Sequence, residues 1–113
     1  MNEKIENIFN NFTVNGVIIP IAFIKYFGKA ETYITYQSVG NNTALSSDDI
    51  ASYSKNNIDI DIYTKGNYIQ IIEKIKEKMK QNDFVWKDDS PDMYESDTGF
   101  YHKTISFVKE MEV

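Results

Sequence analysis

The sequence predicts an α+β domain in which a mainly antiparallel sheet has two helices packed on one face. Two observations lead to this fold class. The predicted order along the chain is helix, three strands, helix, then two or three strands. The clearest unit is a strand followed directly by a helix over residues 57–80, where apolar residues first alternate and then recur at helical spacing. With 113 residues, the chain is expected to form one domain, 1–113.

A short N-terminal helix is predicted over residues 3–12. Its apolar residues fall on one face: Ile5, Ile8, Phe9 and Phe12. Asn15-Gly16 then marks a turn. The next segment, 17–26, is predicted to be a strand, and Pro20 places it at a sheet edge or makes its start irregular because proline has no amide donor.

Residues 27–31 are predicted to form a hairpin connection to a strand over 32–39, and the polar segment 40–49 is predicted to be a mobile loop. A long strand with a defect is predicted over 51–64. Ala51 and Tyr53 occupy odd positions, whereas the isoleucines at 58, 60 and 62 occupy even ones. A strict period of two cannot keep both sets on one face, so a bulge or bend is expected at 55–57.

The second helix is predicted over residues 67–81. Its apolar stripe consists of Tyr68, Ile71, Ile72, Ile75 and Met79, with Ile69 beside it. Asn67 and Gln70 have the spacing of a capping box, and Asn82 is a reasonable stop.

The C-terminal part is predicted to consist of short strands around a hairpin. Residues 84–87 form a strand and 88–92 an acidic loop. Strands over 93–95 and 100–109 then flank a turn at 96–99, in which Gly99 is expected to have positive φ. Residues 110–113 are expected to be frayed or bound to a partner.

Composition argues against several classes of function. The net charge is -5 with only 12 basic residues, which opposes binding to nucleic acid and to anionic membranes. The absence of cysteine excludes disulfides, thiolate metal sites and cysteine nucleophiles and suits a reducing cytoplasm. Met1 to Lys4 have no secretory pattern, and the longest apolar stretch, 17–24, is too short to span a bilayer.

Two sets of residues could carry acid–base chemistry. Asp59 and Asp61 are expected to point the same way from one strand, and two carboxylates at this spacing can serve acid–base catalysis or bind a cation. The solvent face of a half-buried strand explains them more simply. His102 is the only histidine, and Thr104 or Ser106 could be its nucleophilic partner. Adjacency in sequence is not a triad, so a structural or interface histidine is the favoured interpretation.

Two further segments resemble binding motifs only in part. The aspartates at 88, 89 and 92 lack the glycine and closing glutamate of a calcium-binding EF-hand loop. The turn 64–67 lacks the second glycine and the Lys-Ser/Thr pair of a phosphate-binding loop. We therefore predict no enzymatic activity and assign no catalytic, cofactor-binding or metal-binding residue. The aromatic residues of the strand-like segments are expected to serve core and interface packing.

Three segments together resemble a known family: Tyr33–Gln37, Ile58–Tyr68 and Met93–Ile105. The pattern, which covers about residues 17–109, is similar to the tail-completion or tail-terminator-like neck proteins of long-tailed phages and of prophages in Gram-positive bacteria. The resemblance implies a structural virion-assembly protein that completes the tail tube and joins it to the head connector. It also implies a homo-oligomeric ring, such as a hexamer, that assembles in the host cytoplasm and ends in the virion tail or neck.

A ring subunit needs two different contact patches, and the loop 40–49 and the hairpin 93–103 are the candidates for those patches or for the contact with the tube. The implied partners are further copies of the chain, the tail tube protein and head-connector proteins, with no membrane and no specific nucleic acid. Two alternatives remain open: a small acidic binding module or inhibitor of the immunity type, and a hydrolase that uses Asp59, Asp61 or His102.

Overall fold

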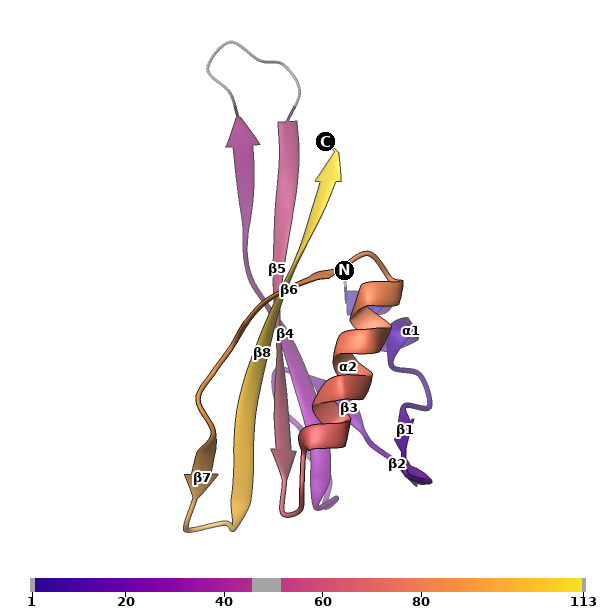
Figure 1. Cartoon of the computed structure of the whole chain (residues 1–113), viewed down its shortest axis with the longest axis vertical. Helices are drawn as coiled ribbons and strands as arrows, with labels where there is room; N and C mark the ends of the chain where they lie inside the picture. The colour runs from indigo at the N-terminus through magenta and orange to yellow at the C-terminus, as the bar shows by residue number, and fades with distance from the viewer. Residues whose placement is uncertain (1, 46–51, 113) are drawn as a thin grey trace.

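The computed structural model describes residues 2–45 and 52–112, with side chains described over 3–39 and 56–109. These residues form an α+β fold that is mostly sheet (Figure 1). The elements in chain order are α1 (Asn2–Ile8), β1 (Thr13–Val14), β2 (Val17–Ile18), β3 (Ile21–Phe23), β4 (Thr32–Leu45), β5 (Ser52–Thr64), α2 (Ile69–Gln81), β6 (Val85–Asp89), β7 (Met93–Glu95) and β8 (Phe100–Glu112).

The main sheet has the strand order β3-β4-β5-β8-β6, and β7 also pairs with β8. The sheet is mixed, because β3 runs parallel to β4 while the other neighbouring pairs are antiparallel. The predicted hairpin at 27–31 was therefore wrong. The chain leaves β3 through Ile24, whose φ is 64°, and returns to the end of the sheet where β3 began, since parallel strands cannot be joined by a tight turn.

Two of the three central strands, β4 and β8, are longer than the sequence predicted, and all three central strands extend beyond the helices (Figure 1). β4 continues through residues 40–45, where a loop was expected, and the rest of that predicted loop, 46–49, lies outside the described residues. The expected irregularity is present but lies on the other strand. Ser38 pairs with Ile58 and Asn41 with Asn56, so two residues of β4 oppose one residue of β5. The register of β5 against β8 is continuous, so the bulge expected at 55–57 of β5 was wrong.

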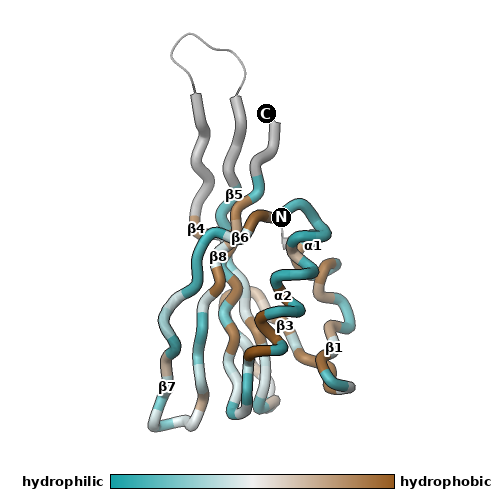
Figure 2. The backbone as a smooth tube through the Cα atoms, in the orientation of Figure 1, coloured by the Kyte–Doolittle hydropathy of each residue, from teal (hydrophilic) through white to brown (hydrophobic). Residues whose placement is uncertain are grey.

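The core combines side chains of both helices with alternate side chains of the long strands. Its largest fully buried side chains come from α1 and the segment after it, from α2 and from β4, β5 and β8: Ile5, Phe9, Phe12, Ile34, Tyr36, Ile58, Ile60, Ile62, Ile75, Met79, Ile105 and Phe107. Figure 2 shows hydrophobic and hydrophilic residues alternating along α2, as expected for a helix with one buried side. The predicted apolar stripes are confirmed except for Ile69, which is 59% exposed.

Both helices are shorter than predicted. α1 ends at Ile8, and Asn11 turns the chain with a φ of 56°, yet Phe9 and Phe12 still enter the core. The capping box of α2 does not form. Asn67 Oδ1 accepts a hydrogen bond from Ile69 N at 2.9 Å, whereas Gln70 accepts one from the side chain of Asn15.

Both predicted turns are confirmed. Asn15 and Gly16 connect β1 to β2 with φ of 53° and 79°, and Gly99, with φ of 77°, closes the turn between β7 and β8. β8 continues to Glu112, so the backbone of 110–112 is paired where a frayed end was expected, and Val113 lies outside the described residues. No helix in the described part of the chain is long and apolar enough to cross a membrane.

Candidate functional site

The polar residues singled out in the sequence meet on the outer face of the sheet, the face of β4, β5 and β8 that points away from the core. Cross-strand pairing places them in three rows: Tyr33–Tyr63–His102, Thr35–Asp61–Thr104 and Gln37–Asp59–Ser106. The two aspartates of β5 thus lie directly beside the histidine and hydroxyl residues of β8. The sequence suggested these as separate candidates, and the structure brings all five together.

Hydrogen bonds link these rows across the two strands. Asp61 Oδ1 accepts a hydrogen bond from Thr104 Oγ1 at 2.5 Å, and His102 Nε2 lies 3.0 Å from the same oxygen. Asp59 Oδ1 accepts one from Ser106 Oγ at 2.7 Å. Each carboxylate is therefore satisfied by groups from the neighbouring strand, as half-buried polar groups require.

This arrangement differs from that of a nucleophile and its base. A hydroxyl nucleophile needs a basic nitrogen to take its proton. Here the hydroxyls of Thr104 and Ser106 and the imidazole of His102 all face carboxylates, and no pairing of a Ser or Thr hydroxyl with His102 occurs among the described residues. The side-chain contacts on this face support the pairing of β5 with β8.

An aromatic ladder crosses the same face at the end near the β7–β8 turn. Tyr26 stacks on Tyr33 at 4.4 Å between ring centroids, Tyr33 on Tyr63 at 4.9 Å and Tyr63 on His102 at 4.2 Å. Burial, followed by the charge of Asp61, raises the pKa of Tyr63 from 10.0 to about 12. Tyr63 therefore stays neutral near neutral pH, and its ring packs between Tyr33 and His102.

The ladder also fixes the loop between β3 and β4. Tyr26 Oη accepts a hydrogen bond from Ala30 N at 3.2 Å, and a Cβ on Gly28 would lie 2.0 Å from that oxygen. The same loop holds Phe27 in solvent, where it is 84% exposed. The sequence predicted only a hairpin connection here, and the one available signal was Gly28 following the two aromatic residues Tyr26 and Phe27.

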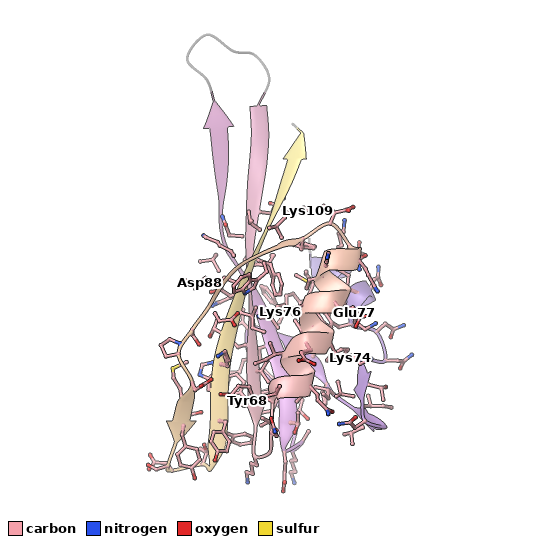
Figure 3. All side chains as sticks on the ribbon, in the orientation of Figure 1. Tyr68, Lys74, Lys76, Glu77, Asp88 and Lys109 are labelled. Carbon is pink, nitrogen blue, oxygen red and sulfur yellow. The ribbon has the colours of Figure 1, made fainter. Side chains whose placement is uncertain are left out.

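The aspartates of segment 88–92 are engaged separately. Asp89 forms an ion pair with Lys76 at 3.2 Å and accepts a hydrogen bond from Trp86 Nε1 at 2.7 Å (Lys76 and Asp88 are labelled in Figure 3). Asp92 lies 3.0 Å from Lys103 Nζ, and its pKa is lowered by hydrogen bonds from Tyr68 and Lys103. Within the described residues, no group of three His, Asp or Glu side chains could hold a metal ion.

The turn at 64–67 links a strand to a helix. Thr64 Oγ1 accepts a hydrogen bond from Gly66 N at 3.1 Å and lies 2.8 Å from Thr32 Oγ1. A pocket of about 340 Å³ opens beside it. Its polar lining is largely engaged within the protein, since Thr32 pairs with Thr64 and Asn15 with Gln70. The turn shows no convergent set of free donors that would hold a phosphate.

Of the two predicted contact segments, the structure describes the hairpin 93–103 in full. Three of its large hydrophobic residues are exposed: Met93 at 38%, Tyr94 at 57% and Tyr101 at 41%. The side chains of 40–49 lie outside the described residues.

No protein-family model matches this sequence, and no curated protein matches it. Among solved structures, the fold is similar to that of a chain in the virion of a native gene transfer agent particle. The TM-score is 0.57 with 11% sequence identity, and the alignment covers 82% of this chain and 78% of the other. At this identity, the similarity shows a shared fold that spans most of both chains.

Proposed function

We propose that this protein is a non-enzymatic structural component of a phage or phage-like virion that completes the tail tube and joins it to the head connector. The observation that carries the proposal is the similarity in fold to a chain of a gene transfer agent virion. It agrees with the resemblance of segments 33–37, 58–68 and 93–105 to tail-completion proteins.

The surface chemistry supports a role in contacts rather than catalysis. On the outer face, Asp59 and Asp61 are engaged by Ser106, Thr104 and His102. By contrast, large apolar and aromatic side chains stand in solvent at the two edges of the sheet, among them Phe27 and Trp86. Exposed aromatics of this kind are typical of protein–protein contact sites.

In this role the protein forms a ring of identical subunits, with a hexamer as the form that the resemblance implies. One side of the ring contacts the tail tube protein and the other contacts head-connector proteins. The subunit assembles in the host cytoplasm and remains in the neck of the virion. A net charge of -5 would allow DNA to pass through the ring without binding to its wall.

Electron microscopy of tails tests the proposal. Tails are compared when the protein is absent and when its gene is supplied in trans. We expect tails of irregular length or tails without heads when the protein is absent, and normal particles when it is restored. Tails of fixed length that still join heads in its absence would overturn the proposal.

One observation favours a second candidate, a small acidic binding module or inhibitor. The segment 85–97 contains five acidic residues and one lysine, and such a surface could attract a basic partner. Native mass separates the two candidates, because a binding module is expected to be monomeric or dimeric whereas a completion protein forms closed rings.

A further inference from the structure

Each edge of the main sheet has exposed apolar side chains, and the charged residues beside them are of opposite sign at the two edges. β3 ends the sheet on one side, and β6 and β7 end it on the other, next to β8. We call the first surface the basic edge, formed by Phe23, Ile24, Lys25, Phe27 and Lys29. We call the second the acidic edge, formed by Val85, Trp86, Asp88, Met93, Tyr94 and Glu95.

The basic edge is held in place by its own backbone. Ile24 N donates to Tyr36 O at 2.9 Å, and Lys25 N donates to Phe23 O at 2.6 Å, which forms a γ-turn with positive φ at Ile24. A β-branched residue rarely adopts this conformation, so its presence marks a constrained segment. Tyr26 anchors the next residue by stacking, and Phe27 is directed into solvent with Lys25 Nζ 5.3 Å from its ring centroid.

The acidic edge presents an aromatic residue whose ring is held by two side-chain contacts. The ring of Trp86 lies 4.5 Å from Lys76 Nζ, and its Nε1 donates to Asp89, yet half of the residue remains exposed. Tyr94 stands farther along the same edge, 4.9 Å from Tyr101 between ring centroids. Rings that are already immobilised lose little conformational entropy when a partner covers them.

We propose that the basic edge of one copy docks against the acidic edge of the next copy, head to tail. Residues 23–29 include two lysines and no acidic residue, whereas residues 85–97 include five acidic residues and one lysine. Asp89 and Asp92 already pair with Lys76 and Lys103, which leaves the charges of Asp88, Glu95 and Asp97 against that of Lys87. The charges are thus complementary between edges and repulsive within each edge, which favours a contact between different patches over a two-fold contact. A strand edge at each end of the sheet also leaves backbone groups for pairing between subunits. This inference rests on the proposed ring and names its interface.

Cross-linking tests the contact directly, because the natural chain contains no cysteine. Phe27→Cys and Trp86→Cys chains are mixed and treated with a short bismaleimide, and circular dichroism confirms that both fold. We expect a cross-link between positions 27 and 86 to exceed the 27–27 and 86–86 products at least tenfold. Lys74→Cys, on the exposed side of α2, is the matched control and should cross-link to neither. A dominant 27–27 or 86–86 product, or no excess over the control, would overturn the proposal.

Charge reversal gives an independent test by analytical ultracentrifugation at low salt. Lys25→Glu with Lys29→Glu should weaken self-association at least tenfold, and so should Asp88→Lys with Glu95→Lys. Self-association should return when the two variants are mixed, and also when all four changes are combined in one chain, because opposite charges again face each other. A wild-type chain that stays monomeric up to millimolar concentration, or variants that associate as well as the wild type, would contradict the contact.

The outcomes also separate this contact from the proposed function. If the wild-type gene restores joined particles but no 27–86 cross-link forms, the interface is wrong and the assembly role stands. If the cross-link forms but particles are normal without the protein, the contact stands and the assembly role fails.

Discussion

Alternate residues of β5 lie on two faces with different chemistry. Ile58, Ile60 and Ile62 are at most 1% exposed and belong to the hydrophobic core, which also includes residues of both helices. Asp59, Asp61 and Tyr63 point the other way, are only half-buried, and contact residues of β4 and β8. One strand therefore contributes to a hydrophobic core and to a polar and aromatic surface at the same time.

The two faces differ in how strongly they hold the fold together. Burying an isoleucine side chain contributes roughly 1.5–3 kcal/mol, whereas a hydrogen bond contributes about 1 kcal/mol net because water is displaced from both groups. The inner face therefore supplies most of the stability of this sheet. The outer face and the sheet edges can vary in composition at lower cost, so they are the regions available for contacts with other proteins.

The largest effect is expected on the inner face. Ile60→Ala removes a side chain that is 0% exposed, between Tyr36 and Ile105 in the sheet register. We expect the free energy of unfolding in urea to fall by about 2–5 kcal/mol, because lost burial and a residual cavity add together. Ile69→Ala is the matched control, since Ile69 is 59% exposed. A loss at Ile60 no larger than at Ile69 would contradict this comparison of the two faces.

A smaller effect is expected at the polar row. Asp61→Ala leaves His102 and Thr104 without their carboxylate partner. We expect a loss of roughly 1–3 kcal/mol, the cost of half-buried groups left without a hydrogen bond. A double-mutant cycle with Thr104→Ala isolates the pair and should give a coupling energy above about 0.5 kcal/mol. Additive losses would show that the two side chains do not interact, and Glu73→Ala on the exposed side of α2 controls for a change of charge.

The division into two faces was largely predictable from the sequence. Alternation at 58–63 and helical spacing at 71, 75 and 79 depend on local geometry, and the buried residues followed these patterns. The turns at Asn15-Gly16 and Gly99 were also predictable, because positive φ restricts the choice of residue.

The pairing between distant segments was not predictable in the same way. The partners of Asp61 lie 41 and 43 residues away in sequence, at His102 and Thr104, and no local pattern indicates which strands will be neighbours. The parallel pairing of β3 with β4 escaped prediction for the same reason, since the connection between them resembled a hairpin. The bulge expected at 55–57 of β5 was wrong, because the extra residue lies in β4 and the positions of apolar residues in β5 carry no information about its partner strand.

The loop that presents Phe27 gives a third test. Gly28→Ala places a Cβ where Tyr26 Oη now lies, so Tyr26 must move away from Ala30 N and Tyr33. We expect a loss of about 1 kcal/mol, the size of one hydrogen bond, together with a change in the near-ultraviolet circular dichroism of the tyrosines. Gly66→Ala is the control, since its Cβ would meet only Thr64 Oγ1, at an ordinary 3.8 Å. Equal effects of the two substitutions would mean that Gly28 is not needed for the packing of Tyr26.

The smallest effect at neutral pH is expected for Tyr63→Phe, which keeps the aromatic ladder and removes only the hydroxyl. The folded state raises the pKa of Tyr63 from 10.0 to about 12. Above pH 10 the unfolded chain therefore loses this proton first, so the folded state binds more protons and its stability falls until about pH 12. Tyr63→Phe should match the wild type at pH 8 and decline less steeply between pH 10 and 12, while Tyr68, whose pKa is also raised to about 12, keeps part of the decline. Urea unfolding at a series of pH values measures this difference. Parallel curves for the two proteins would show that the outer face does not shield Tyr63 from water. The outer face would then differ from the buried inner face more than its contacts suggest.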